Sequence, residues 1–129
     1  MARQKPGSDV LDRVFAVIQS RKGGDTRTSH TARLLSSGKA GVARKLGEEA
    51  LETIAAALTE PKSRIVSESA DLLFHLLVLW AASGLRPEQI WAELARREGT
   101  SGIAEKASRS SAKPKSAKPK GARRGLRHK

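Results

Sequence analysis

The sequence predicts an all-α fold, a bundle of four to five helices followed by a basic tail. Apolar residues recur at helical spacing in several segments, and no segment alternates apolar and polar residues as a half-buried strand would. Aromatic residues are scarce, with two Phe, two Trp and no Tyr, so the core must be built from Leu, Ile, Val and Ala. Residues 9–107 are expected to form this bundle, after a flexible N-terminus of residues 1–8.

The first two helices are expected to be short and separated by a polar loop. Ser8 is the expected N-cap of the first helix, and Gly23 with Gly24 ends it. Ser29 is the expected cap of the second helix, which stops near Gly38. The apolar residues of the first helix fall at helical spacing: Val10, Leu11, Val14, Val17 and Ile18.

The next two helices are expected to be long and joined by a tight turn. The third runs from about Gly41 to Glu60, and the fourth reaches Ser83 and stops at Gly84. Pro61 is placed in the first turn of the fourth helix, because a proline there lacks only an N–H that the helix does not need. The apolar side of the third helix is predicted to contain Leu46, Ile54 and Leu58.

The last helix and the tail differ in composition. Pro87 opens a fifth helix that ends at Gly99, with Ile90, Trp91 and Leu94 as its apolar stripe. From residue 108 the sequence turns to Ser-Ala-Lys-Pro-Lys repeats and then to Arg-rich residues, with too few apolar side chains to fold. We therefore expect residues 108–129 to form a disordered tail.

The net charge of +12 is concentrated in this tail. Residues 1–104 carry 15 Lys and Arg against 12 Asp and Glu, whereas residues 105–129 carry 10 against one. The tail offers no aromatic residues to stack on bases and no motif that reads a nucleic acid. It therefore predicts at most weak, salt-sensitive and non-specific binding to nucleic acid.

Several classes of protein are excluded or disfavoured by what the chain lacks. It has no Cys, which excludes disulfide scaffolds, thiol nucleophiles and Cys-ligated metals. Its three His are scattered at positions 30, 75 and 128, which disfavours a His-based metal cage. No apolar run reaches the roughly 18 to 20 residues that span a bilayer, so we expect a cytoplasmic protein without a membrane partner.

The informative residues are carboxylates within helices that should be apolar. The fourth helix is apolar around nearly its whole circumference, which predicts burial, yet it carries Glu68 and Asp71 three residues apart. Burying two ionised carboxylates together costs several kcal/mol unless a cation compensates them. This pair therefore indicates a cation site.

A second acidic set lies on the preceding helix. Its pattern is E-E-x-x-E over Glu48, Glu49 and Glu52, followed after 15 residues by the E-x-x-D of the fourth helix. Two antiparallel helices joined near Pro61 would bring the two sets to nearly the same level. Five carboxylates in one groove predict a hard divalent cation, with Mg²⁺ or Mn²⁺ favoured over zinc.

Five segments of the chain together resemble a known family. They are residues 14–22, 29–35, 44–53, 68–79 and 97–107. Over about residues 9–108 the sequence is similar to the phosphoribosyl-ATP pyrophosphatase family, within the all-α nucleotide pyrophosphohydrolase superfamily. It departs from the family at His30, where Tyr is usual, and at Phe74, where Tyr is frequent. Because nothing precedes the first helix, we expect the stand-alone form of the enzyme.

The resemblance implies hydrolysis of phosphoribosyl-ATP to phosphoribosyl-AMP and pyrophosphate with Mg²⁺, the second step of histidine biosynthesis. The implied metal ligands are Glu48, Glu52, Glu68 and Asp71. Glu49 and Glu48 are the catalytic candidates, with Glu49 as a further ligand or the base. The predicted substrate-binding residues are Lys45, Ser29, Thr31, Arg33, Arg21 and Lys22.

His75 has two interpretations, because it lies four residues after Asp71 on the apolar helix. It is either a core histidine bonded to a backbone carbonyl or a residue that supports the metal site. The resemblance also implies a homodimer, which agrees with a small helical body that gains core by pairing.

Two other functions stay open at this point. One is a housekeeping pyrophosphohydrolase for (deoxy)nucleoside triphosphates that uses the same carboxylates. The other is a non-enzymatic protein that binds nucleic acid through the basic tail.

Overall fold

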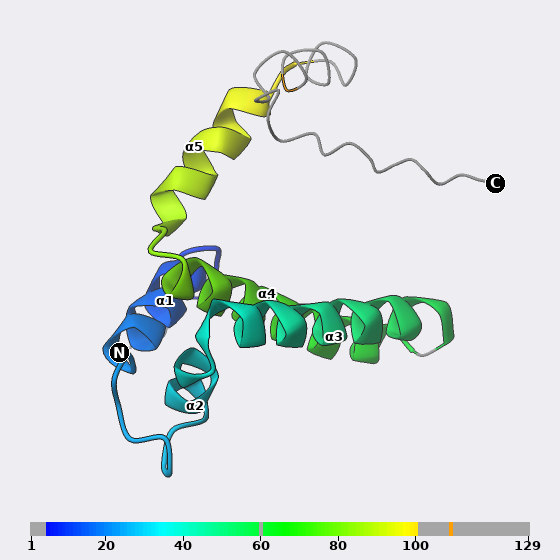
Figure 1. Ribbon diagram of the computed structural model, residues 1–129. Helices are drawn as coiled ribbons and strands as arrows, with labels where there is room; N and C mark the ends of the chain where they lie inside the picture. Colours follow the sequence, from blue (N-terminus) through cyan, green and yellow to red (C-terminus); the bar gives the residue numbers. More distant parts are fainter. Residues whose placement is uncertain (1–4, 60, 101–108, 110–129) are drawn as a thin grey trace, which may run out of the picture. The chain divides into compact units, whose positions relative to one another are not determined.

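The computed structural model describes residues 5–59, 61–100 and 109, and it contains five helices there (Figure 1). The described residues contain no strand, so the all-α prediction is confirmed. Most of the predicted tail and the predicted domain boundary at residue 107 lie outside the described residues. The helices are α1 (Val10–Ser20), α2 (His30–Ser36), α3 (Gly38–Thr59), α4 (Lys62–Ala82) and α5 (Pro87–Arg97).

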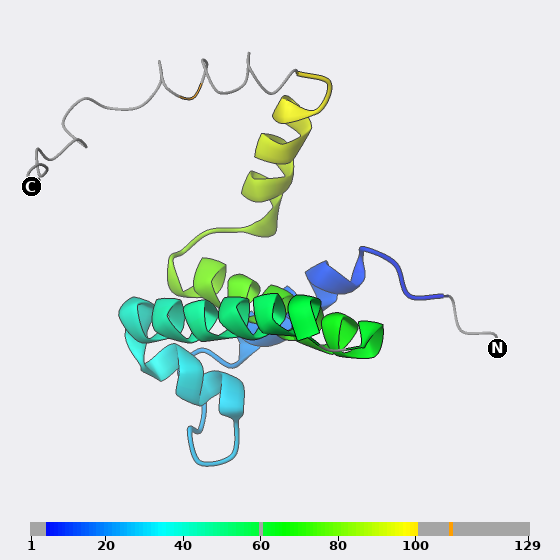
Figure 2. The ribbon, with the colours of Figure 1, turned by 90° about the vertical axis from the view of Figure 1, so that its right-hand side faces the viewer.

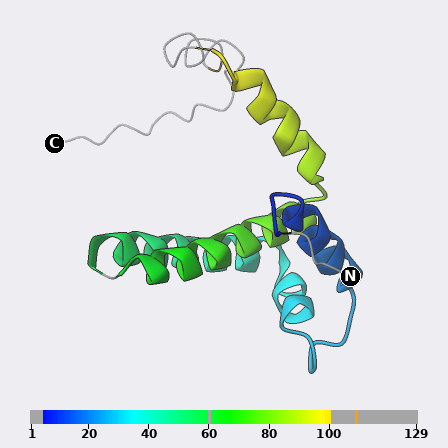
Figure 3. The same cartoon turned by 180° about the vertical axis from the view of Figure 1, so that it is seen from behind.

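The chain divides into two compact units, Met1–Ile90 and Trp91–Lys129. In the first unit α3 and α4 form an antiparallel hairpin and pack along each other, which is also seen in Figure 2. Helix α1 packs on α4 near the end of that helix, as Figure 3 shows from behind, and α2 packs against α3 and α4. The second unit includes the larger part of α5.

The core of the first unit forms where α1, α2 and the hairpin meet. As the composition predicts, most of its side chains are aliphatic. The buried apolar residues of the described chain are Phe15, Ile18, Ala32, Val42, Ala56, Leu77, Val78, Trp80 and Ala81.

The predicted apolar side of α3 is wrong for its second half. Ile54 and Leu58 are exposed, at 55% and 78%, whereas Val42 and Ala56 are buried. Toward the Pro61 turn each hairpin helix is covered mainly by the other, because α1 and α2 do not extend there (Figure 1). The apolar residues that point away from the partner helix therefore remain open.

Helix α4 is long and apolar enough to cross a membrane by length and composition alone, with a mean hydropathy of 1.5. The core helix of a soluble protein meets the same criterion, so this finding is weak evidence for a membrane span. The buried side chains of α4 include Glu68 and His75, and an ionisable side chain at the centre of a bilayer is costly.

The helix starts confirm one prediction and correct three. Ser29 caps α2, since its Oγ accepts a 3.0 Å hydrogen bond from the backbone N–H of Ala32. The N-cap of α1 is Asp9 rather than Ser8, because a backbone hydrogen bond from Val10 to Gly7 closes that turn without a side-chain cap.

The other two corrections concern the hairpin. Helix α3 begins at Gly38 instead of Gly41, with only Ser37 between it and α2. Pro61 has extended backbone and is the N-cap residue of α4 rather than a member of its first turn, which suits a residue that cannot donate a backbone hydrogen bond.

The predicted end of α4 at Gly84 is confirmed. Gly84 has φ +73°, and the backbone N–H groups of Gly84 and Leu85 donate to the carbonyls of Ala81 and Trp80. This pair of bonds is the Schellman arrangement, in which a left-handed glycine closes a helix.

Gly38 and Gly47 allow a matched test of backbone conformation. Gly38 links α2 to α3 with φ +80°, whereas Gly47 lies inside α3, and no heavy atom lies within 4 Å of a Cβ added at either. Gly38→Ala should lower the free energy of unfolding by about 1 kcal/mol, because a Cβ disfavours the left-handed region. Gly47→Ala should raise it by about 0.5–1 kcal/mol. Urea denaturation measures both, and equal effects of the two substitutions would contradict this explanation.

Candidate metal and substrate site

Three carboxylates of the hairpin come together between α3 and α4. Glu49 of α3 and Glu68 and Asp71 of α4 each offer one oxygen, and these oxygens lie within 4.8 Å of one another. Glu68 is buried, Glu49 is half-buried and Asp71 is exposed. The group, here called the acidic trio, is therefore reached from solvent on the Asp71 side.

The spacing of inward residues explains why the trio forms. Val42, Glu49 and Ala56 repeat every seven residues along α3 and none of them is exposed. Glu68 and His75 repeat in the same way along α4 and are both buried. A seven-residue repeat keeps side chains on one side of a helix, so Glu49 and Glu68 both face the partner helix.

Thr53 connects the two helices at the level of the trio. Its Oγ1 lies 2.9 Å from the backbone oxygen of Glu49 and 3.2 Å from that of Glu68. The hydroxyl has one proton and can donate it to either carbonyl. Thr53 is therefore a contact that fixes the register of α3 against α4.

Removing this hydroxyl should weaken the hairpin. We expect Thr53→Val to lower the free energy of unfolding by about 1 kcal/mol, the usual contribution of one hydrogen bond. Thr53→Ser, which retains the hydroxyl, should lose less. Chemical denaturation of both variants measures the difference, and a Val variant as stable as the wild type would exclude a structural role for this contact.

The trio has the composition and size that suit a hard divalent cation. All of its donors are carboxylate oxygens, which Mg²⁺ prefers. Two ligands on opposite sides of Mg²⁺ are about 4.2 Å apart, close to the 4.8 Å within which the trio lies. Small side-chain movements would close the difference.

The other two acids of α3 are not members of the trio. Glu48 is 58% exposed in its side chain, against 13% for Glu49, and Lys45 Nζ lies 3.5 Å from a carboxylate oxygen of each. Glu52 is exposed on the next turn of α3. The ligand roles predicted for Glu48 and Glu52 therefore stay predictions.

Lys45 stays charged beside these acids. Desolvation works to lower the pKa of Lys45, but the charges of Glu48 and Glu49 and their hydrogen bonds together raise it above its ordinary value. Lys45 therefore offsets part of the negative charge at the edge of the trio.

Sequence reasoning missed a second cation at this site. Arg64 Nη2 lies 2.7 Å from Glu68 Oε2. The two residues are four apart on α4, a spacing that places side chains on one helix face. That spacing was visible in the sequence and could have identified the pair.

His75 makes the contact expected of a core histidine. Its Nδ1 lies 2.7 Å from the backbone oxygen of Asp71, so Nδ1 carries the proton that is donated there. Its ring packs edge-on against Phe74 at 5.2 Å. Nε2 is buried without a hydrogen-bond partner among the described residues. His75 therefore touches the backbone of Asp71, while its predicted support of the metal site stays a prediction.

The predicted substrate-binding residues on the α1–α2 side are partly brought together. Of these, Arg21 and Ser29 line one open, polar hollow of about 590 Å³, which Asp25 and His30 also line. The Ser29 hydroxyl is already used as the α2 cap. Lys22 is exposed and Thr31 half-buried, and neither lines this hollow.

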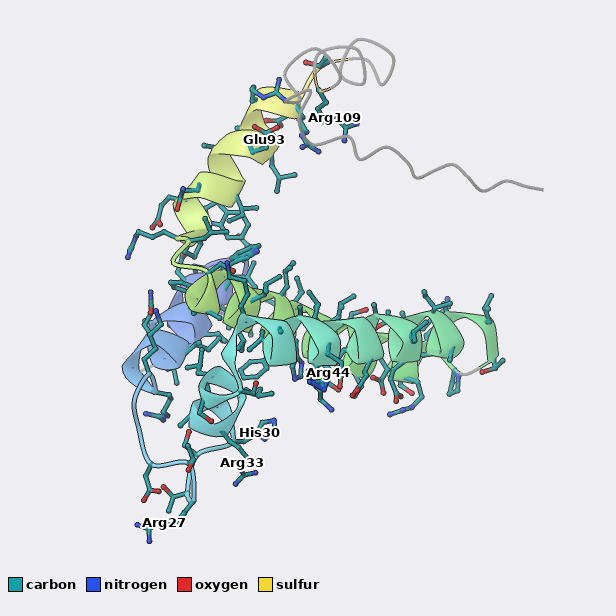
Figure 4. The ribbon with its side chains drawn as sticks, in the orientation of Figure 1. Arg27, His30, Arg33, Arg44, Glu93 and Arg109 are labelled. Carbon is teal, nitrogen blue, oxygen red and sulfur yellow. The ribbon has the colours of Figure 1, made fainter. Side chains whose placement is uncertain are left out.

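Arg33 does not line this hollow and instead contacts the α1–α2 loop. The Nε and Nη2 atoms of Arg33 donate to the Thr26 backbone oxygen at 3.3 and 3.1 Å, which holds the α1–α2 loop. Figure 4 shows His30 and Arg33 on α2 and Arg44 on α3 below the hairpin, with Arg27 farther out on the loop. Arg33 and Arg44 thus place two cations on this side of the first unit, whereas Arg27 is paired with Asp25 on the loop.

Comparisons with known proteins show which family the chain resembles. The family model described as phosphoribosyl-ATP pyrophosphohydrolase matches residues 11–98, which contain the whole acidic trio. The proteins named phosphoribosyl-ATP pyrophosphatase from Azospirillum brasilense and Paramagnetospirillum magneticum are 55% and 57% identical to this chain. The alignments cover 86% and 79% of this chain and 100% and 94% of those relatives. The relative of that name from Rhodospirillum rubrum is 54% identical over 81% of this chain and 89% of its own length.

The model match spans well over half of the chain, and the relatives are matched over nearly their whole length. An all-helical fold and an acidic trio with the ligand chemistry of a hard cation accompany this match. The chain belongs to the phosphoribosyl-ATP pyrophosphohydrolase family.

Proposed function

We propose that this protein hydrolyses phosphoribosyl-ATP to phosphoribosyl-AMP and pyrophosphate, the second step of histidine biosynthesis. The observation that carries the proposal is the family match over residues 11–98. The acidic trio within that range supports it, because hydrolysis of a phosphoanhydride requires neutralisation of the charge on the leaving pyrophosphate.

The proposed metal is Mg²⁺, held by Glu49, Glu68 and Asp71. Glu52, one turn after Glu49 on α3, is the proposed fourth ligand. When bound, the cation supplies charge neutralisation at the phosphate oxygens and the leaving group. Glu49 has two carboxylate oxygens, and we assign the second to orienting the attacking water and accepting its proton. Glu48 is proposed to act with Lys45 at the edge of the site.

The proposed phosphate and ribose contacts come from Lys45 and from the α1–α2 side. Lys45 suits a phosphate because its pKa is raised and it remains charged. The hollow beside Arg21, Ser29 and His30 has the polar lining that a phosphate or a ribose needs. The remaining proposed contacts are Thr31, Arg33 and Lys22.

We also propose a homodimer that is formed by the outer half of the hairpin. Its exposed apolar residues lie on one stripe of α3 and one stripe of α4, and single scattered apolar residues would not follow a helical repeat. A second copy of the same chain offers an equally apolar, self-complementary surface. The stripe of α3, here called the hairpin stripe, consists of Leu51, Ile54 and Leu58, and the stripe of α4 consists of Val66 and Leu73.

Because the proposed substrate is a soluble nucleotide, we place the protein in the cytoplasm. The dimer would also account for the apolar character of α4 without a membrane, since only 33% of its apolar window is buried within one chain.

The test is phosphorus NMR of the purified full-length chain with phosphoribosyl-ATP and Mg²⁺, with ATP and dNTPs in parallel. Release of pyrophosphate from phosphoribosyl-ATP alone would support the proposal. Equal or faster turnover of ordinary triphosphates would assign the protein to a housekeeping pyrophosphohydrolase instead. No turnover of any substrate would overturn an enzymatic role.

A further inference from the structure

Arg64 and Glu68 form an ion pair on α4. Arg64 Nη2 is 2.7 Å from Glu68 Oε2, and the side chains are 47% and 8% exposed. Such a short contact between two charged groups is among the stronger hydrogen bonds in proteins. Arg64 therefore compensates the buried carboxylate of the trio from a position that is open to solvent.

A divalent cation and Arg64 would compete for the Glu68 carboxylate. An arginine keeps its charge at any pH that the protein meets, so it cannot relieve the repulsion by losing a proton. A metal bound at Glu68 would instead repel the guanidinium and favour its movement away from the carboxylate. The side chain of Arg64 is 47% exposed, which leaves it room for that movement.

The substrate supplies a replacement partner for the guanidinium. A planar guanidinium matches the oxygens of a phosphate as well as those of a carboxylate. The leaving pyrophosphate would be released beside the metal, and thus close to the residue that the metal displaces. Arg64 can exchange one anion for another without losing its charge compensation.

We propose that Arg64 is a substrate-binding residue that exchanges the Glu68 carboxylate for a phosphate oxygen of the pyrophosphate group when metal and substrate bind. This inference rests on the proposed function, because it assumes that Glu68 binds a metal. A residue that only held Glu68 in place would strengthen metal binding. Arg64, in contrast, would compete with the metal for Glu68.

The exchange predicts opposite effects on two ligands. Arg64→Gln should bind Mn²⁺ about threefold to tenfold more tightly, because a competing charge close to the metal is removed. The same variant should bind pyrophosphate, in the presence of saturating Mn²⁺, about tenfold or more weakly, because a charged hydrogen bond is lost. Arg64→Lys retains the charge without the planar fork and should give intermediate values for both.

Calorimetric titration of the full-length protein with Mn²⁺ alone, and then with inorganic pyrophosphate, measures both constants without turnover. Arg13→Gln is a matched control, because Arg13 Nη1 makes a 2.9 Å pair with Asp9 that has the same four-residue spacing on α1. Circular dichroism checks that each variant is folded. The control should leave both constants unchanged.

Tighter Mn²⁺ binding together with weaker pyrophosphate binding would support the exchange. Weaker binding of both ligands would assign Arg64 a purely structural role and overturn it, and so would unchanged pyrophosphate binding. If the wild type failed to bind Mn²⁺, the proposed metal site itself would fail, and the exchange with it. The wild-type titration therefore separates the failure of the proposed function from the failure of this inference.

Discussion

Glu68→Gln is expected to lower the turnover of phosphoribosyl-ATP by about 10³-fold or more, because a neutral amide cannot replace a charged metal ligand. The amide has nearly the shape of the carboxylate, so the hairpin should keep its packing. Arg64, the ion-pair partner of Glu68, is half-exposed and can be solvated when the pair is lost. Steady-state rates and Mn²⁺ titration measure the effect, and circular dichroism checks the fold.

The neighbouring acids of α3 make this prediction specific. Glu49→Gln should lower turnover as much as Glu68→Gln does, because Glu49 belongs to the acidic trio. Glu48→Gln is the matched control, since the same change is made one residue away on a side chain that is 58% exposed. We expect this substitution to lower turnover by less than about tenfold, because only one exposed charge contact is lost. A severe loss for Glu48→Gln with a mild one for Glu49→Gln would restore the ligand set implied by the resemblance.

The helices were predictable from the sequence because their ends carry specific chemistry. Ser29 and Gly84 marked the start of α2 and the end of α4, and both marks depend only on local hydrogen bonding and on backbone conformation. The start of α1 was missed at Ser8 because a backbone turn can close a helix without a side-chain cap. Local sequence does not distinguish these two ways of starting a helix.

The sequence predicted an acidic site between the two helices, but not which of the carboxylates come together there. Glu48 and Glu49 are adjacent, and each has a helical spacing to Glu52, so spacing within the motif favours neither. The choice between them depends on which side of α3 faces α4. The repeat of Val42, Glu49 and Ala56 carried that information, but Leu46, Ile54 and Leu58 suggested another side.

This error on α3 has a physical cause. Apolar residues were assigned to the inside of the bundle, whereas the inner side at this level is occupied by carboxylates and Thr53. The apolar side chains of Ile54 and Leu58 were therefore left on the outside. A sequence pattern does not distinguish a core within one chain from a surface that is buried between two chains.

Ile54→Arg tests whether this apolar surface is buried between two chains. It should separate the proposed homodimer into monomers. Ile54 is 55% exposed and lies between Leu51 and Leu58 on the hairpin stripe, so in a monomer the arginine would simply be solvated. In a symmetric dimer the substitution occurs twice, and each copy would bury a charge without a partner, which costs several kcal/mol. We therefore expect the dissociation constant of the dimer to rise by about 10³-fold or more.

Sedimentation over a range of protein concentrations measures this change. Val17→Arg on α1 provides the matched control, because Val17 is similarly exposed at 49% but lies outside the hairpin stripe. A wild-type protein that sediments as a monomer, or an Ile54→Arg variant that remains dimeric, would refute the proposed interface. Separation by Ile54→Arg alone would mean that the apolar side of α3 belongs to a core after all, and that this core is completed by a second copy of the chain.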